Sequence, residues 1–322
     1  MASAGLPAPV WALTTGEAGV AGQAEGLAAA VARPYEVKRV RLHRPWSWLP
    51  AHRQVPGLLR VGLAEPLGTP WPELLITCGR KSASISVAIR RASRGRCFTV
   101  HVQNPRIPLH HFDLVVPPRH DGVSGPNVLE TRVALHRLTP EMLAAAGEAW
   151  RNKLGPLNVA VLLGGRSRSH HFTPETLEQL AEGLARLEGP IAVTASRRTE
   201  QGVTAALKAR LPEAWFWDGT GCNPYPGMLA LARHIVVTED SVSMISEAVS
   251  TGKPVYTARM AGGSRRLARF QSSLMADGII RRFDGQLADW RYEPIHDLPC
   301  IAAELLRRMK AKSFQAQQLQ GE

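Results

Sequence analysis

Short apolar runs and helix-like segments alternate along almost the whole chain. Runs such as residues 74–78 (LLITC) and 157–163 (LNVAVLL) end at glycine, and each is followed by a segment with the apolar spacing of a helix. Strands buried on both faces of a parallel sheet are apolar and short, and helices connect them. The alternation therefore predicts an α/β fold in which helices cover both faces of parallel sheets.

The predicted elements follow from this rhythm. Residues 15–23 (TGEAGVAGQ) are expected to form a glycine-rich turn, and residues 128–135 a last strand or a turn. The predicted strands are 10–14, 35–42, 74–78, 97–103, 113–116, 157–163, 191–194, 215–217, 235–237 and 254–256, and the predicted helices are 24–32, 82–92, 139–153, 173–187, 199–211, 224–232, 241–250 and 298–312.

One interruption divides the chain into two series of such units. A helix opens at Thr139-Pro140, a favoured N-cap and first-turn pair, and ends at Leu154-Gly155-Pro156. A chain of 322 residues is long enough for about two domains. We predict Rossmann-like doubly wound domains over residues 1–153 and 154–297 that face a ligand cleft. Residues 298–322 are then a last helix that crosses back to the first domain and a frayed tail.

The charge of the chain favours anionic partners. Lys and Arg number 39 against 27 Asp and Glu, a net charge of +12 with a pI near 10.2. The basic residues are scattered without a long block, which argues against nucleic acid. In residues 45–59, Trp46 and Trp48 stand beside Arg44 and Arg53, an arrangement that suits a lipid acceptor at an anionic membrane surface. The alternative is that these tryptophans pack inward.

Several classes of protein are disfavoured by missing patterns. The four cysteines are far apart and form no CxxC pair, which is typical of reduced thiols in the cytoplasm. No signal peptide or membrane-length apolar run is expected. No GxGxxG follows the first strand, and neither a P-loop nor a DxD motif occurs. His110-His111 and His170-His171 lack a third ligand, so we expect loop residues and no metal site.

The stretch 238–256 (TEDSVSMISEAVSTGKPVY) is the most informative. A strand ends at Asp240, and a helix follows with Ser241, Ser243 and Ser246. The unpaired N–H groups and the dipole of a helix start attract anions, so a diphosphate is expected there. Glu247, about two turns further, is placed to accept hydrogen bonds from ribose hydroxyls. The alternative is a helix merely capped by Asp240 or Ser241, with Glu247 solvated.

Other polar residues follow predicted strands on the same rim. The alternative is a plain turn with exposed arginines for the first group, a solvated helix start for the second, and ordinary turn residues for the third. The candidates for binding the same nucleotide are Gly164, Gly165, Arg166 and Ser167, then Ser196, Arg197 and Arg198, then Asn223, Pro224 and Tyr225.

The first half offers a candidate proton acceptor. His120 and Asp121 follow the strand of the segment DLVVPPRHD, and either could act as a general base that removes a proton from a substrate. The alternative is a buried or turn-forming pair. Glu17 is the substitute if this pair plays no such role.

The motifs resemble a known family. Ser246-Glu247 and Gly252-Lys253-Pro254 are similar to the donor site of GT-B glycosyltransferases, where the glutamate holds the ribose and the helix start holds the diphosphate. Over nearly the whole chain, the sequence resembles the mitochondrial-fission Elm family, whose bacterial members are described as glycosyltransferases of this type and sometimes as nucleoside-diphosphate-sugar epimerases. The matching segments include CGRKSA, VQNPR, FDLVVPPRHD, NVLETRVALH, VAVLLGGRSRSHHF, TASRRT, NPYPGMLALA and VVTEDSVSMISEAVSTGKPVY.

The resemblance implies a GT-B-like fold and a metal-independent transferase. The first domain would bind the acceptor, and the second a nucleotide-diphospho-sugar as donor substrate, with no other cofactor. We expect a cytoplasmic protein, free or peripheral at the inner face of a membrane. The family also implies an alternative, because plant members act as adaptors for a division dynamin: a peripheral adaptor that keeps the fold and lacks the chemistry.

Overall fold

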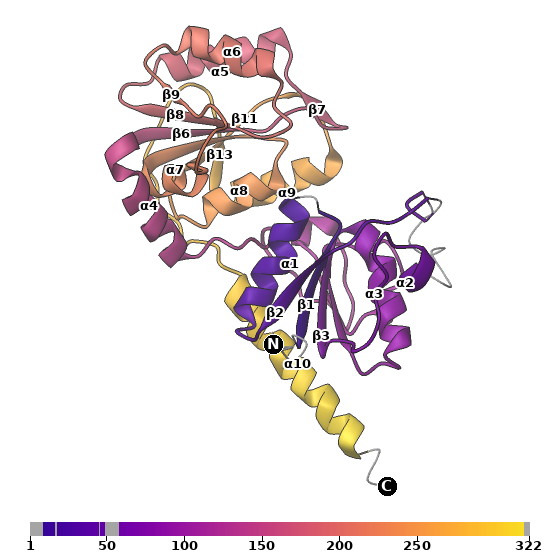
Figure 1. The fold of residues 1–322 in the computed structure, drawn as a ribbon. Coiled ribbons are helices and arrows are strands. Elements are labelled where there is room, and N and C mark those ends of the chain that lie inside the picture. The colour runs from indigo at the N-terminus through magenta and orange to yellow at the C-terminus, as the bar shows by residue number, and fades with distance from the viewer. Residues whose placement is uncertain (1–8, 17, 45, 49–57, 319–322) are drawn as a thin grey trace, which may run out of the picture. The chain divides into compact units, whose positions relative to one another are not determined.

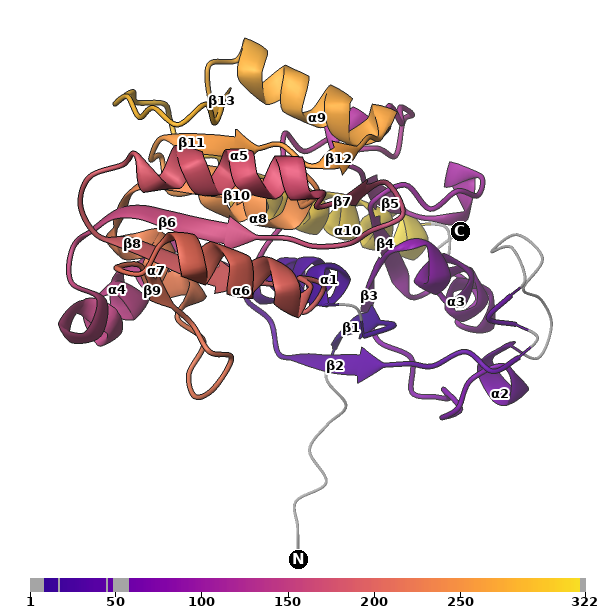
Figure 2. The same cartoon turned by 90° about the horizontal axis from the view of Figure 1, so that it is seen from above.

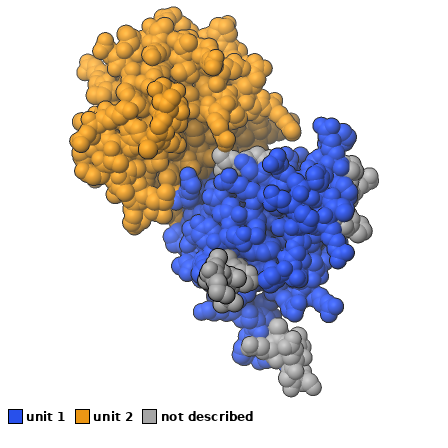
Figure 3. All heavy atoms as spheres, viewed as in Figure 1, with its two compact units in different colours: residues 1–137, 297–322 blue, residues 138–296 orange. Residues whose placement is uncertain are grey.

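The computed structural model describes residues 9–16, 18–44, 46–48 and 58–318. The chain forms two compact units, residues 1–137 with 297–322 and residues 138–296, which Figure 3 colours blue and orange. Each unit contains its own sheet of parallel strands. The prediction of an α/β fold with parallel sheets is confirmed.

The first unit is built on a five-stranded parallel sheet. Its strand order is β2-β1-β3-β4-β5, the order of flavodoxin-like sheets. Figures 1 and 2 both show β1 and β3 between the helices α1 and α3. The elements are β1 (Val10–Thr14), α1 (Ala18–Ala30), β2 (Tyr35–Arg39), α2 (Leu58–Val61), β3 (Leu74–Cys78), α3 (Arg80–Ala92), β4 (Phe98–Val102), the 3-10 helix η2 (Leu109–His111), β5 (Leu114–Val116), the 3-10 helix η3 (Arg119–Asp121) and α10 (Leu298–Gln318).

Both faces of this sheet are covered by apolar clusters. On one face, Leu27 of α1 and Leu305 of α10 pack with Ile76 of β3. On the other face, Ile85 of α3 packs with Leu13 of β1. The strands are therefore buried on both sides, which explains their nearly continuous apolar sequence. The last helix supplies part of the core of the first unit.

The second unit is built on a six-stranded parallel sheet. Its order is β13-β11-β10-β6-β8-β9, which reads 3-2-1-4-5-6 from the β9 edge when the six strands of this sheet are numbered in chain order. Figure 1 shows α5 and α6 on one face and α4, α7 and α8 on the other. The elements are α4 (Pro140–Leu154), β6 (Leu157–Leu163), β7 (His170–His171), α5 (Pro174–Ala185), β8 (Ile191–Ala195), α6 (Gln201–Arg210), β9 (Trp215–Phe216), α7 (Tyr225–Leu231), β10 (Ala232–Thr238), α8 (Val242–Val249), β11 (Val255–Ala258), β12 (Ala261–Gly262), α9 (Arg265–Ala276) and β13 (Ile280–Arg282).

Some predicted elements were wrong or missing. The predicted turn 15–23 is helical from Ala18 onward, since Val20, Ala24 and Leu27 pack on the core and outweigh the helix penalty of the glycines. Residues 128–135 contribute isolated bridges and no named strand. His170-His171 form β7, which pairs with β12, and are not loop residues. Helix α9 and strand β13 were not predicted.

Helix α4 belongs to the second unit, although the sequence analysis placed the boundary after it, at residue 153. The reason lies in its packing on α7. Gly227 of α7 lies so close to α4 that a Cβ atom there would be 2.6 Å from the Trp150 ring. The second unit therefore begins at Leu138. None of the described helices is long and apolar enough to cross a membrane.

Candidate functional site

The second sheet has a reversal in strand succession between β6 and β10. These are the first and fourth strands of this sheet in chain order, and they are neighbours in it. Ligands of open parallel sheets bind outside the carboxyl ends of strands at such a reversal. Gly164 and Gly165 follow β6, and Glu239 and Asp240 follow β10. We call the carboxyl ends of β6, β8 and β10, with the start of α8, the switch edge.

Asp240 ties together three loops at the switch edge. Its Oδ1 accepts a hydrogen bond from the Thr238 hydroxyl at 2.7 Å. Its Oδ2 accepts from the Gly165 N–H at 3.3 Å and from Nη2 of Arg198 at 2.8 Å. The side chain has no solvent exposure. Asp240 therefore holds the loops in place, and its carboxylate is not presented to a solute.

Gly164 and Gly165 have no room for side chains. A Cβ on Gly164 would lie 1.9 Å from Oδ1 of Asp240, and one on Gly165 would lie 2.0 Å from the Arg198 carbonyl oxygen. The Thr199 hydroxyl donates to the Gly164 carbonyl at 2.5 Å. We predicted that these glycines allow a ligand to approach the backbone. In the structure, the packing of neighbouring loops already requires them.

Arg198 combines a fixed guanidinium with access to solvent. Its Nη1 donates to the Gly165 carbonyl at 3.3 Å, its Nη2 donates to Asp240, and 45% of the side chain is exposed. The Ser196 hydroxyl accepts from the Arg198 N–H at 3.2 Å and shapes this loop. Arg197 beside it is exposed. Because a guanidinium carries five N–H donors, Arg198 keeps donors for an anion.

Arg166 and Ser167 have different roles in the loop after β6. Nε of Arg166 lies 2.6 Å from Oε1 of Glu200, and both side chains are largely exposed. The Ser167 hydroxyl accepts from the N–H of Ser169 at 3.3 Å and of His170 at 3.0 Å. Ser167 therefore shapes a turn, while Arg166 is a surface cation with a weak partner.

Helix α8 begins at the switch edge. Ser241 is its N-cap, and the hydroxyl accepts from the Met244 N–H at 3.3 Å. The N–H groups of Val242 and Ser243, at the first helical positions, have no intrahelical acceptor and lie at the positive end of the helix dipole. Ser246 is buried, and its hydroxyl donates to the Val242 carbonyl at 2.7 Å. Ser241 and Ser246 thus serve the helix itself.

Glu247 is held by a tyrosine from the preceding helix. The Tyr225 hydroxyl donates to Oε2 of Glu247 at 2.6 Å, so Glu247 is not simply solvated. Burial, with repulsion from the Glu247 carboxylate, raises the pKa of Tyr225 well above its usual value. Asn223 Oδ1 accepts from the Tyr225 N–H at 3.1 Å, and Pro224 is buried before α7. Asn223 therefore shapes the turn before α7, as the alternative prediction had it.

The sequence predicted no role for Thr238 and no contact for Lys253, which it gave only as part of a motif. Nζ of Lys253 donates to the carbonyls of Leu229 at 2.8 Å and Ala230 at 2.5 Å at the end of α7, and burial lowers its pKa to about 8. The Thr238 hydroxyl accepts from the Gly164 N–H at 2.6 Å. A threonine two residues before an aspartate at a strand end was a usable signal for Thr238. The contact of Lys253 with α7 has no local signal.

His120 and Asp121 form η3 in the first unit, after β5. Nε2 of His120 lies 3.7 Å from Oδ1 of Asp121, and the side chains are 1% and 4% exposed. Oδ2 of Asp121 accepts from the Asn104 N–H at 3.3 Å. The pair is thus buried and forms a turn, the alternative that the sequence left open. Glu17, the substitute for this pair, lies outside the described residues.

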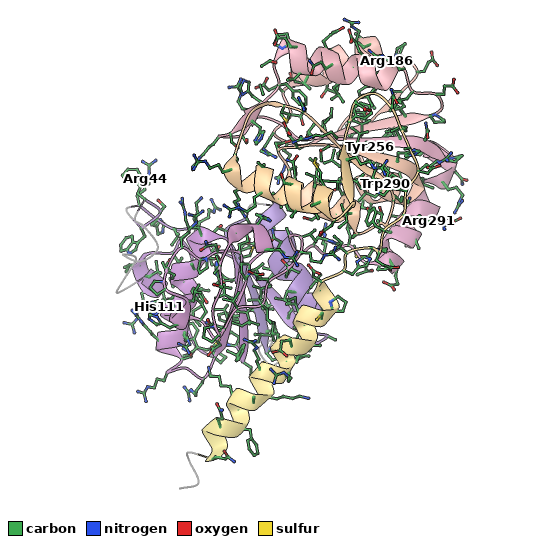
Figure 4. The ribbon with its side chains drawn as sticks, turned by 180° about the vertical axis from the view of Figure 1, so that it is seen from behind. Arg44, His111, Arg186, Tyr256, Trp290 and Arg291 are labelled. Atoms are coloured by element: carbon green, nitrogen blue, oxygen red, sulfur yellow. The ribbon has the colours of Figure 1, made fainter. Side chains whose placement is uncertain are left out.

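The two tryptophans Trp46 and Trp48 differ in their exposure to solvent. Trp46 packs against the core, whereas Trp48 is 70% exposed and lies 4.6 Å from the guanidinium of Arg44, which Figure 4 labels. Residues 45 and 49–57, which include Arg53, lie outside the described part. Among the described residues, no three His, Cys, Asp or Glu side chains are grouped as metal ligands.

Solved structures share this architecture. The UDP-GlcNAc 2-epimerase of Methanocaldococcus jannaschii matches with a TM-score of 0.53 and 11% identity over 94% of this chain and 99% of that chain. MurG of Acinetobacter baumannii matches with a TM-score of 0.50 and 11% identity over 96% and 94%. Because such neighbours are GT-B glycosyltransferases and epimerases, the GT-B-like fold prediction is confirmed.

Sequence comparisons identify the family. The mitochondrial fission protein ELM1 of Arabidopsis thaliana is 32% identical over 278 residues, which are 76% of this chain and 65%, less than two thirds, of that protein. An uncharacterized protein of Rickettsia prowazekii, RP120, is 24% identical over 277 residues, 72% of this chain and 78% of that protein. The family profile described as mitochondrial fission ELM1 matches residues 18–309. The chain therefore belongs to the mitochondrial fission ELM1 family, as the motifs had indicated.

Proposed function

We propose that this protein is a metal-independent glycosyltransferase whose second unit binds a nucleotide-diphospho-sugar at the switch edge. The observation that carries the proposal is the grouping, at one strand reversal, of the α8 N-terminus, the anchored guanidinium of Arg198 and, further along α8, Glu247. These groups match the chemistry of a diphosphate followed by a ribose.

The spacing along α8 suits such a ligand. Glu247 is six residues beyond Ser241, about 9 Å along a helix axis at roughly 1.5 Å per residue. The diphosphate would meet the N–H groups of Val242 and Ser243 and the free donors of Arg198. The ribose hydroxyls would meet Glu247, and the base would lie towards Asn223 and Tyr225.

Catalysis would be electrostatic. The leaving nucleoside diphosphate gains negative charge as the glycosidic bond breaks, and the helix N–H groups with Arg198 are placed to stabilise that charge. Donors held in advance by Asp240 need no reorganisation during the reaction. The proton acceptor is proposed to be His120 or Asp121, which must become accessible to act, with Glu17 as the substitute.

Proteins of similar fold support the class of ligand. The UDP-GlcNAc 2-epimerase of Neisseria meningitidis was solved bound to UDP-GlcNAc and matches this chain with a TM-score of 0.50 and 11% identity. At that identity, the likeness concerns the fold. Acceptor-dependent release of a nucleoside diphosphate would distinguish sugar transfer from epimerisation.

The test is titration of uridine, guanosine and cytidine diphosphates into the protein and two variants. Glu247→Ala should weaken binding by about 1–3 kcal/mol, as expected for hydrogen bonds to a charged group. Ser243→Ala should have a smaller effect, since its backbone N–H remains. Absence of binding by all three nucleotides would overturn the donor-site proposal.

The acceptor is proposed to be a lipid or saccharide at an anionic membrane surface. The first unit has 21 Lys and Arg against 11 Asp and Glu, whereas the second unit has 18 against 16. Most of the net charge of the chain therefore lies in the first unit. Salt-sensitive binding to vesicles with phosphatidylglycerol, and none to phosphatidylcholine, is expected in a flotation assay. Equal binding to both vesicles would exclude an electrostatic attachment.

A non-catalytic adaptor is the second candidate. The observation that favours it is the name of the Arabidopsis relative, a mitochondrial fission protein. Nucleotide-sugar binding with acceptor-dependent turnover would support the transferase. Failure of every nucleotide sugar to bind would favour the adaptor.

A further inference from the structure

Helix α7 is fixed by two side chains from one short segment, residues 247–253. Glu247 accepts from the Tyr225 hydroxyl at the N-terminal end of α7, and Lys253 donates to the carbonyls of Leu229 and Ala230 at its C-terminal end. The Lys253 carbonyl in turn accepts from the Tyr292 hydroxyl at 2.7 Å. Tyr225 therefore stands on a helix whose position relative to Glu247 is set at both ends.

The Tyr225 hydroxyl has only one chemical state available near neutral pH. Burial and the neighbouring carboxylate raise its pKa, so it stays protonated and donates. The donor–acceptor distance of 2.6 Å is in the range of a hydrogen bond to an ionised acceptor. A carboxylate offers about four acceptor positions on two oxygens, and the Tyr225 hydroxyl takes one of them.

We propose that Tyr225 is a positioning residue, which fixes the rotamer of Glu247 so that its carboxylate meets the ribose hydroxyls, and that the Tyr225–Glu247 pair thereby selects ribonucleotides over 2′-deoxyribonucleotides. This inference rests on the proposed donor site. It assigns Tyr225 a role through Glu247, in addition to the place near the base proposed above. A carboxylate that is free to rotate would lose much of this selection, because each hydrogen bond would first have to order the side chain.

The experiment compares Tyr225→Phe with Tyr256→Phe. Tyr256, labelled in Figure 4, lies in the same unit, and its hydroxyl is bonded to the backbone of Ala288, so its loss tests a comparable change away from Glu247. Dissociation constants are measured by calorimetry for the tightest binder among uridine, guanosine and cytidine diphosphates and for its 2′-deoxy counterpart. Thermal unfolding of each variant is recorded in parallel.

The wild-type protein should prefer the ribonucleotide by about tenfold or more, the effect of a hydrogen bond to a charged group. Tyr225→Phe should reduce this ratio to about threefold or less, while Tyr256→Phe should keep it. A Tyr225→Phe variant that melts earlier but keeps the wild-type ratio would show that the bond only joins α7 to α8, and would overturn the inference. Equal wild-type affinity for both nucleotides would overturn it as well. If no nucleotide binds the wild-type protein, the proposed donor site itself fails.

Discussion

At the level of single residues, His101 in the first unit is fully buried within β4. Its Nδ1 lies 2.8 Å from Oγ1 of Thr77, and its ring centroid lies 5.1 Å from that of Phe112. Burial lowers the pKa of His101 to about 3. The unfolded chain binds a proton at this residue below about pH 6.5, whereas the folded protein does so only near pH 3. The free energy of unfolding therefore falls as the pH is lowered through this window.

We expect His101→Gln to reduce the acid sensitivity of the protein. One proton of difference changes the free energy of unfolding by up to about 1.36 kcal/mol per pH unit, and the variant should lose that part of the slope. Urea midpoints measured at intervals from pH 7 to pH 4 would show it. The control, His110→Gln, changes an exposed histidine and should follow the wild-type curve. If the stability of His101→Gln falls with decreasing pH as steeply as that of the wild type, His101 is not a source of the acid sensitivity.

Asp240 and Glu200 offer a matched comparison of two ion pairs at the switch edge. Asp240→Ala removes a buried carboxylate with three donors and should lower the free energy of unfolding by about 2–3 kcal/mol. Glu200→Ala removes an exposed partner of Arg166 and should cost less than about 1 kcal/mol. Urea unfolding of both variants measures the difference. Similar losses would mean that the Asp240 network is weaker than its geometry indicates.

At the level of elements, the loops after β6 and β8 are packed too closely for any side chain at Gly165. We expect Gly165→Ala to destabilise the second unit by about 1–3 kcal/mol and to weaken nucleotide binding, because Arg198 must move. Gly202→Ala is the control. Gly202 lies in α6 with no atom within 4 Å of its added Cβ, and the change should stabilise by about 0.5–1 kcal/mol. Chemical unfolding of both variants checks that Gly165→Ala lowers the free energy of unfolding and that Gly202→Ala raises it.

The repeated apolar runs allowed most parallel strands to be predicted, because a buried strand shows its pattern within five to seven residues. The start of α1 was predicted wrongly, since the local glycine signal was outweighed by contacts with distant strands. Helix α9 had a usable signal in Leu267, Phe270 and Leu274, spaced for one helix face after the N-cap Ser264. The many arginines and serines between these apolar residues made the helical spacing hard to recognise.

The residue types of the candidate site were predictable, but the direction of each side chain was not. Ser246 follows the same pattern as Ser243, yet Ser246 is buried and donates to a helix carbonyl. The network of Asp240 depends on Gly165 and Arg198, which are 75 and 42 residues away in the chain. Such contacts depend on strand order, and no local pattern specifies that order.

At the level of the whole molecule, each unit has its own sheet and core, so we expect two transitions in calorimetry. A bound nucleoside diphosphate should raise the transition temperature of the second unit only. At a hundredfold excess over its dissociation constant, it adds about 2.7 kcal/mol to the free energy of unfolding of that unit. Leu305→Ala, a truncation in the core of the first unit, should lower the free energy of unfolding of the first unit by about 2–5 kcal/mol. Joint shifts of both transitions would contradict independent units.

Helix α10 returns to the first unit after the whole second unit has been built, and Ile301, Ala302 and Leu305 fill the core beside α1. On the ribosome, the second unit can therefore fold once residue 296 has emerged. The first unit, although made earlier, stays incomplete until the final helix leaves the exit tunnel. During that interval, its apolar face beside α1 is open to chaperones, and premature termination before residue 298 would release a chain with this face uncovered.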